Sequence, residues 1–182
     1  MVAWRLSLAL VCMSALVCAP ARAQQQHEPR ATEAALTATY LYKFLSYVEW
    51  PPGRFPLADT PLEIGVAGSE AVLAELQGLL ASRRVSGRQV LARPITLADP
   101  LDRLHVLFVG AEARAPQYIE RLAAAAVVVV TEGSGGLDAG AMLNFIAIDG
   151  RVRFEAAPAA AERAGLKLGA RLLSVAERVL VK

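Results

Sequence analysis

Short apolar segments that alternate with helical patterns constrain the fold of this chain more than any other feature. The strand patterns cover residues 62–67, 89–95, 104–109 and 126–130. The run at 104–109 is almost unbroken, which is typical of a strand buried on both faces of a sheet. Helical patterns follow at 70–82 and 115–125. Strands and helices that alternate at this spacing indicate an α/β domain with a largely parallel sheet.

A β-hairpin is predicted in the C-terminal part, where Asp149-Gly150 separates strand patterns at 143–148 and 151–155. A two-residue turn fixes the register of such a hairpin. The predicted pairs are Ile148 with Arg151, Ala147 with Val152, Ile146 with Arg153, Phe145 with Phe154, and Asn144 with Glu155. One face is then apolar, and the other mixes isoleucines with polar residues. Either arginine stems cover these isoleucines, or this face meets a helix or a partner.

Helical patterns also span residues 31–50 and, at the end of the chain, residues 158–164 and 170–180. We therefore expect one domain over residues 31–182. Its predicted fold is α/β, a mixed and mostly parallel sheet of about six strands with a C-terminal antiparallel hairpin and helices on both faces.

The N-terminus has the features of a secretory signal peptide. Arg5 precedes an apolar run at 6–19, and Ala21-Arg22-Ala23 provides the small residues of a cleavage site. The run is too short to span a bilayer comfortably. We expect residues 1–23 to be a signal peptide, cleaved after Ala23, and residues 24–30 to be a flexible arm. The predicted location is the periplasm.

Loss of this leader changes the composition of the working protein. Both cysteines, Cys12 and Cys18, would be removed, which leaves no disulfide and no thiolate metal ligand. Two of the 19 Lys+Arg residues would also be lost, leaving a net charge of about zero against 17 Asp+Glu. Electrostatic attraction to nucleic acid or anionic lipid is therefore not expected.

No catalytic constellation is recognisable in the sequence. Ser134 lies in the loop at 132–136 but lacks the Gly-x-Ser-x-Gly context, and His27 and His105 are poorly placed to serve it as a base. The same loop has no P-loop lysine. Two scattered histidines without cysteines or paired carboxylates do not form a metal site. We therefore expect a protein that is not an enzyme and has no cofactor or metal.

Aromatic residues are concentrated between residues 40 and 55, which hold six of the ten aromatic residues beyond residue 23. Either they pack between helix and sheet with their hydroxyl groups reaching solvent, or they form an interface, where Tyr and Trp are enriched. The candidate interface residues are Tyr40, Tyr42, Tyr47, Trp50 and Phe55. A candidate structural polar cluster on the hairpin contains Asn144, Arg153 and Glu155, with Arg171 as a possible neighbour.

Two blocks of the sequence stand out as motifs. The first is Tyr42–Pro51. The second lies near the C-terminus and consists of Met142–Phe145, Asp149–Glu155, Ala160–Lys167 and Arg171–Leu173. The first block is similar to the "YKF..YVEWP" opening of the YfiR family of exported bacterial proteins, and the second resembles that family's C-terminal signature. Two departures from the family are the absence of cysteine from the exported part, so that redox gating cannot apply, and Gly169-Ala170 where paired serines are common.

The resemblance implies a periplasmic α/β domain without known catalytic residues that associates with itself. The best-known member binds the periplasmic sensor domain of an inner-membrane diguanylate cyclase, which lowers cyclic-di-GMP and biofilm formation. Our leading hypothesis is therefore a regulatory protein that represses such a cyclase, or another membrane receptor, by contact, and that forms a homodimer. The alternative is a periplasmic small-ligand binding module that uses the carboxyl ends of the parallel strands.

Overall fold

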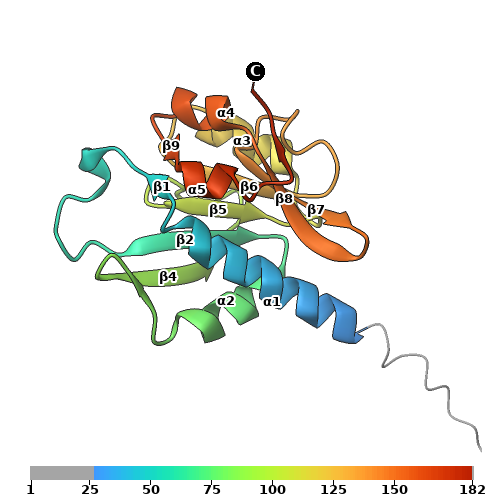
Figure 1. Ribbon diagram of the computed structural model, residues 1–182. Coiled ribbons are helices and arrows are strands. Elements are labelled where there is room, and N and C mark those ends of the chain that lie inside the picture. The colour runs from blue at the N-terminus through green and yellow to red at the C-terminus, as the bar shows by residue number, and fades with distance from the viewer. Residues whose placement is uncertain (1–26, 182) are drawn as a thin grey trace, which may run out of the picture.

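The computed structural model describes residues 27–181, with side chains described from residue 32 onward (Figure 1). Its main sheet has eight strands in the order β10-β8-β7-β6-β5-β2-β4-β3. They are β2 (Leu62–Ala67), β3 (Arg84–Val85), β4 (Arg88–Pro94), β5 (Val106–Val109), β6 (Val128–Glu132), β7 (Leu143–Ile148), β8 (Arg151–Ala156) and β10 (Arg178–Val179). The five central strands, from β4 to β7, pair in parallel, and β8 returns antiparallel to β7. The predicted α/β fold class is confirmed.

Helices cover both faces of this sheet, as expected. The helices are α1 (His27–Phe44), α2 (Glu70–Leu80), α3 (Ala115–Leu122), α4 (Pro158–Arg163) and α5 (Ala170–Leu173), with a 3-10 turn at Pro52–Arg54. One face packs against α1, α2, α4 and α5 around a core that contains Ile64, Phe108 and Phe145. The other face packs against α3, around Leu107 and Val129. We call them the α1 face and the α3 face.

The hairpin of β7 and β8 has the predicted register, from Ile148 opposite Arg151 to Asn144 opposite Glu155. Its turn residues, Asp149 and Gly150, have φ angles of 49° and 69°. Positive φ at both central residues is the type I′ geometry that matches the twist of the flanking strands. The hairpin prediction is therefore confirmed.

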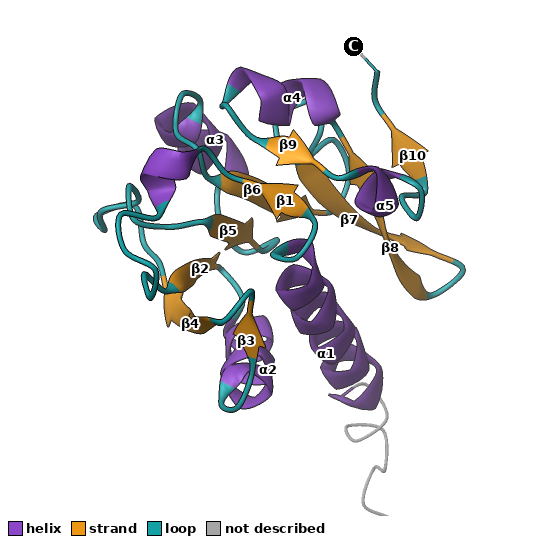
Figure 2. Cartoon of the chain, turned by 60° about the vertical axis from the view of Figure 1, so that its left-hand side comes forward, coloured by secondary structure: helices purple, strands orange, loops and turns teal. Residues whose placement is uncertain are grey.

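Both ends of the first helix differ from the prediction. It begins at His27, which includes residues 27–30 of the predicted arm, and it ends at Phe44 instead of Trp50. A turn follows, and β1 (Val48–Glu49) then pairs with β9 (Lys167–Leu168) in a separate two-stranded sheet (Figure 2). Because β1 and β9 are far apart in the sequence, no local sequence pattern predicts their pairing. The predicted signal peptide lies outside the described residues.

The last predicted helix, 170–180, is wrong beyond Leu173. Residues 178–179 instead form β10, which pairs in parallel with Glu155 and Ala156 of β8. The sheet exceeds the predicted six strands because β3 and β10 have two residues each, too few to show a period. No helix among residues 27–181 is long and apolar enough to cross a membrane.

Candidate partner-binding groove

A groove of about 330 Å³ separates the C-terminal half of α1 from α5 on the α1 face, and we call it the α1–α5 groove. Its lining residues come from the end of α1 and the turn after it, from β8, and from α5 and the residues that follow. They are Tyr40, Lys43, Phe44, Tyr47, Phe154, Arg171, Leu172 and Val175.

Aromatic packing fixes the floor of the groove. Phe44 stacks on Phe145 at 5.8 Å between ring centroids and meets Phe154 edge-on at 5.0 Å. Tyr40 contacts both Phe145 and Phe154, at 5.8 and 5.7 Å. Ring pairs of this kind gain about 0.5–1.5 kcal/mol each beyond area burial, so these contacts stabilise the floor of the groove.

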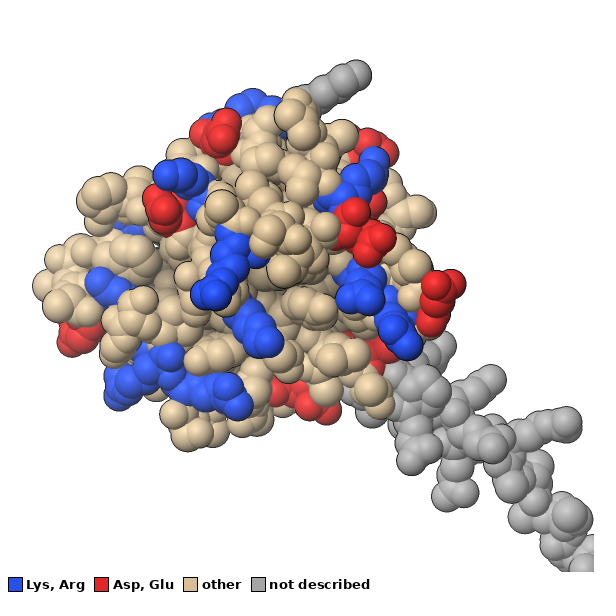
Figure 3. Space-filling view, in the orientation of Figure 1, with Lys and Arg blue, Asp and Glu red and all other residues tan. Residues whose placement is uncertain are grey.

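The rim of the groove is basic and partly apolar. Lys43 and Arg171 are exposed, and neither forms an ion pair with another described residue. Val175 is 67% exposed and adds an apolar side chain to the rim. Figure 3 shows Lys and Arg side chains over the part of this face where α1 and α5 lie. The groove therefore suits an apolar group that carries a neighbouring negative charge.

The five aromatic residues predicted as an interface do not lie together. Tyr40 and Tyr47 line the α1–α5 groove. The Tyr42 hydroxyl donates to the Arg84 carbonyl at 3.2 Å, on another part of the surface. Trp50 and Phe55 pack edge-on at 6.2 Å, beside the His105 ring. Only the first two can therefore contribute to one contact surface at this groove.

The structure brings together only two members of the predicted polar cluster. The Asn144 amide nitrogen donates to a Glu155 carboxylate oxygen at 3.3 Å. Arg153 is exposed farther along β8, and Arg171 instead lines the groove on the α1 face beside Phe154. The cation that binds Glu155 is Arg178, whose Nε donates to the carboxylate at 2.7 Å. The sequence did not point to Arg178, because this residue fell within the helix predicted over residues 170–180.

Thr131 and Asn144 complete a row of polar side chains on the α3 face. Thr131, Asn144, Glu155 and Arg178 stand opposite one another on β6, β7, β8 and β10. The Thr131 hydroxyl donates to Asn144 Oδ1 at 2.8 Å, and Asn144 Nδ2 also donates to the Gly133 carbonyl at 2.8 Å. We call these four side chains the polar row.

Electrostatics favour the charged form of Glu155. The hydrogen bond from Arg178 lowers the pKa of this carboxyl group, while burial opposes the shift and the bond from Asn144 adds to it. The loop at 133–136 covers the row, because a Cβ at Gly136 would lie 2.1 Å from Thr131 Oγ1 and 2.3 Å from Asn144 Oδ1. The loop that includes Ser134 thus closes over a structural network, and Ser134 itself is exposed.

The model of the YfiR/HmsC-like family matches residues 34–177, well over half of the chain. This chain belongs to the YfiR/HmsC-like family. Members of the YfiR/HmsC-like family are periplasmic regulators rather than enzymes. The matched range includes every lining residue of the α1–α5 groove. No curated protein matches the chain. Among the described residues, no three His, Cys, Asp or Glu side chains are grouped so that they could hold a metal ion.

Proposed function

We propose that this protein binds the periplasmic sensor region of an inner-membrane diguanylate cyclase and represses the enzyme, which lowers cyclic-di-GMP. Membership of the YfiR/HmsC-like family carries this proposal. A protein that regulates an enzyme by contact acts by binding two states of that enzyme with different affinity. Another membrane receptor would be controlled in the same way.

The α1–α5 groove is the contact surface that we propose. An aromatic floor beside an exposed valine favours an apolar anchor from the partner, since buried anchors supply most of the binding energy at interfaces. Lys43 and Arg171 would pair with acidic residues beside that anchor and select the partner by charge.

Matched substitutions of exposed valines test this proposal. Val175→Asp places a carboxylate at the rim of the groove, whereas Val181→Asp does so at a valine that is 84% exposed and does not line the groove. In cells that lack the gene, we expect cyclic-di-GMP to rise and wild-type protein to restore the low level. The Val181→Asp protein should also restore it, and Val175→Asp should fail to do so.

Two results would contradict the proposal. If cyclic-di-GMP is unchanged when the gene is deleted, the protein is not a repressor of a cyclase. If deletion raises cyclic-di-GMP but the Val175→Asp and Arg171→Glu proteins both restore the low level fully, the groove is not the contact surface. Binding of each variant to the purified sensor region should follow the cellular result.

We also propose that the protein works as a homodimer, as the resemblance to the YfiR family implies. Light scattering on the purified protein should give twice the mass of a single chain. A mass that stays at that of one chain at micromolar concentration would rule the dimer out, without affecting the proposed contact with the cyclase.

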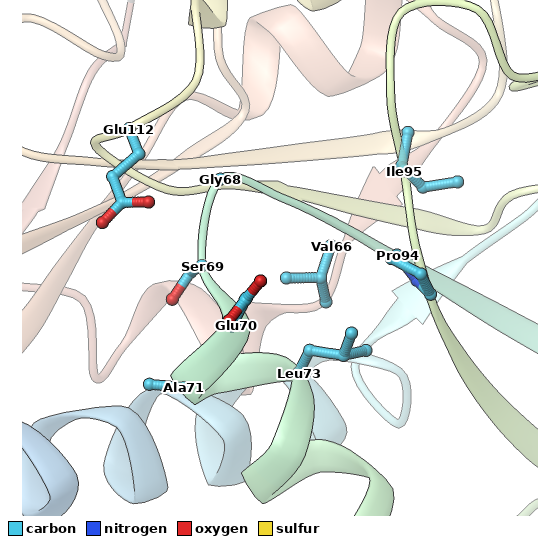
Figure 4. Close-up of a pocket in the computed structure, with 9 residues that line it drawn as sticks. All are labelled: Val66, Gly68, Ser69, Glu70, Ala71, Leu73, Pro94, Ile95 and Glu112. Atoms are coloured by element: carbon cyan, nitrogen blue, oxygen red, sulfur yellow. The ribbon is translucent and has the colours of Figure 1, made fainter.

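A second candidate function is the binding of a small ligand at the carboxyl ends of β2 and β4. A cavity of about 530 Å³ lies there, against the first turn of α2 (Figure 4). The charged residues that line it, Glu70 and Glu112, are both acidic. This charge disfavours phosphates and carboxylates. A thermal shift with one metabolite, in a protein that binds no cyclase, would favour this function over repression.

A further inference from the structure

A different cavity, of about 400 Å³, lies where β2 begins and the chain enters β5, at the opposite ends of these strands from the cavity of Figure 4. Its lining residues come from the 3-10 turn, from the segment before β2 and from the loop before β5. They include Arg54, Glu63, Asp102, Arg103 and His105. This volume is within the range of small-molecule sites. We call it the His105 cavity.

His105 provides a buried donor without an acceptor. The residue is 3% exposed, and its Nδ1 accepts the Glu63 backbone N–H at 3.1 Å. Because Nδ1 is the acceptor, the neutral ring carries its proton on Nε2. Nε2 is buried and has no hydrogen-bond partner. A buried donor left in this state costs about 1–3 kcal/mol, unless a ligand satisfies it.

The imidazole stays neutral at physiological pH. Burial, followed by the positive charge of Arg54, lowers the pKa of His105 to about 4, and Arg88 contributes in the same direction. The Arg54 carbonyl partly opposes this shift but makes no hydrogen bond to Nε2. Two guanidinium groups therefore give the surroundings of His105 positive charge.

Arg54, like His105, has a buried N–H donor without a hydrogen-bond partner. Its guanidinium donates to the backbone carbonyls of Asp102, at 2.6 Å, and Leu104, which hold the group in place. Its Nε is buried without a partner, and so is Nε1 of Trp50, whose ring lies 5.8 Å from that of His105. Among the described residues, these three nitrogens are the complete set of buried side-chain polar atoms without a partner. All three are N–H donors in one neighbourhood.

We propose that the His105 cavity binds a small hydroxycarboxylate, whose carboxylate accepts hydrogen bonds from His105 Nε2 and Arg54 Nε. Arg103, at the cavity wall, adds positive charge. Glu63 and Asp102 also line the cavity, so they disfavour a dianion such as phosphate and can accept from hydroxyl groups. An adjoining hollow of about 930 Å³ shares Glu63, Asp102 and Arg103, and gives room for the rest of the ligand.

Trp50 reports on this cavity, because its ring contacts those of Phe55 and His105. In a Trp4→Phe background, Trp50 is the one tryptophan of the chain. We expect lactate to change Trp50 fluorescence in a saturable way. Propane-1,2-diol, which lacks the carboxylate, should have no effect, and inorganic phosphate should bind at least tenfold more weakly than lactate.

Two variants identify the donors. His105→Asn keeps an acceptor for the Glu63 N–H but removes the Nε2 donor, and Arg54→Gln removes the guanidinium. Each should weaken lactate binding at least tenfold, whereas Arg151→Gln, at an exposed residue of β8, should leave it unchanged. If Arg54→Gln fails to fold, the NMR signal of His105 Nε2 in wild-type protein replaces it and should shift when lactate binds. Absence of a saturable signal, equal binding of the diol, or unchanged affinity in His105→Asn would overturn the proposal.

Discussion

The polar row and the His105 cavity both place polar side chains inside the protein, but they treat the hydrogen bonds of those side chains in opposite ways. In the row, Thr131, Asn144, Glu155 and Arg178 donate to and accept from one another. Around His105, three buried N–H groups have no acceptor. A satisfied network stabilises the fold, whereas unsatisfied donors at a cavity wall are prepared for a ligand that the fold does not supply.

The position of each region relative to the sheet explains why the polar row satisfies its hydrogen bonds and the His105 cavity does not. The row crosses four neighbouring strands in register, so that each side chain faces the next at the distance of paired strands. His105 precedes β5, and Arg54 lies in the turn before β2. There the geometry is set by loops, and loops positioned by a rigid sheet are where binding residues are commonly found.

The largest expected effect is on the polar row. Asn144→Leu leaves the Thr131 hydroxyl, the Gly133 carbonyl and the Glu155 carboxylate each without one partner. The bonds to Thr131 and Glu155 are buried, and each buried group left without a partner costs about 1–3 kcal/mol, so we expect the free energy of unfolding to fall by about 4 kcal/mol. Urea unfolding measures this change.

Thr131→Val is the matched control, because it removes one hydrogen bond and keeps the shape of the side chain. It should cost about 1 kcal/mol. If Asn144→Leu costs no more than Thr131→Val, the row does not act as a network, and its difference from the His105 cavity disappears.

The next effect concerns His105 and depends on pH. Its pKa is about 4 in the folded protein, against 6.5 for an ordinary histidine. The unfolded chain therefore binds a proton more readily, and stability falls as pH drops from about 6.5 towards 4. The total contribution is about 3 kcal/mol. His105→Asn should remove this part of the pH dependence. An identical slope in wild type and variant between pH 6.5 and 4.5 would show that His105 titrates normally.

Local rules predicted the regular parts of the fold. The hairpin register followed from Asp149-Gly150, because a two-residue turn leaves one pairing. The buried strand β5 followed from an apolar run. The pairing of Val48 with Leu168 and of Arg178 with Glu155 was missed, because each joins two-residue segments whose partners are determined by the tertiary fold.

The candidate sites were less accessible from the sequence. Of the aromatic residues concentrated at 40–55, Tyr40 and Tyr47 line the α1–α5 groove, whereas Tyr42 lies on another part of the surface and Trp50 lies beside the His105 ring. The unpaired Nε2 of His105 could not be predicted at all. Whether a buried nitrogen has an acceptor depends on the surrounding loops rather than on residue type or spacing.

The smallest effect is expected at the open end of the polar row, where Arg178 is half exposed. Arg178→Gln removes the hydrogen bond that lowers the pKa of Glu155. A carboxyl group whose pKa is lowered by folding stabilises the protein above its ordinary pKa of 4.5, and this stabilisation is lost as pH falls through the folded value. The variant should therefore be less stable than wild type at pH 7. Because solvent screens the pair, this loss should be smaller than that caused by Thr131→Val. In acid, the free energies of unfolding of variant and wild type should become equal. A deficit that persists unchanged at pH 3 would mean that Arg178 stabilises β10 by packing its stem, and not through the charge of Glu155.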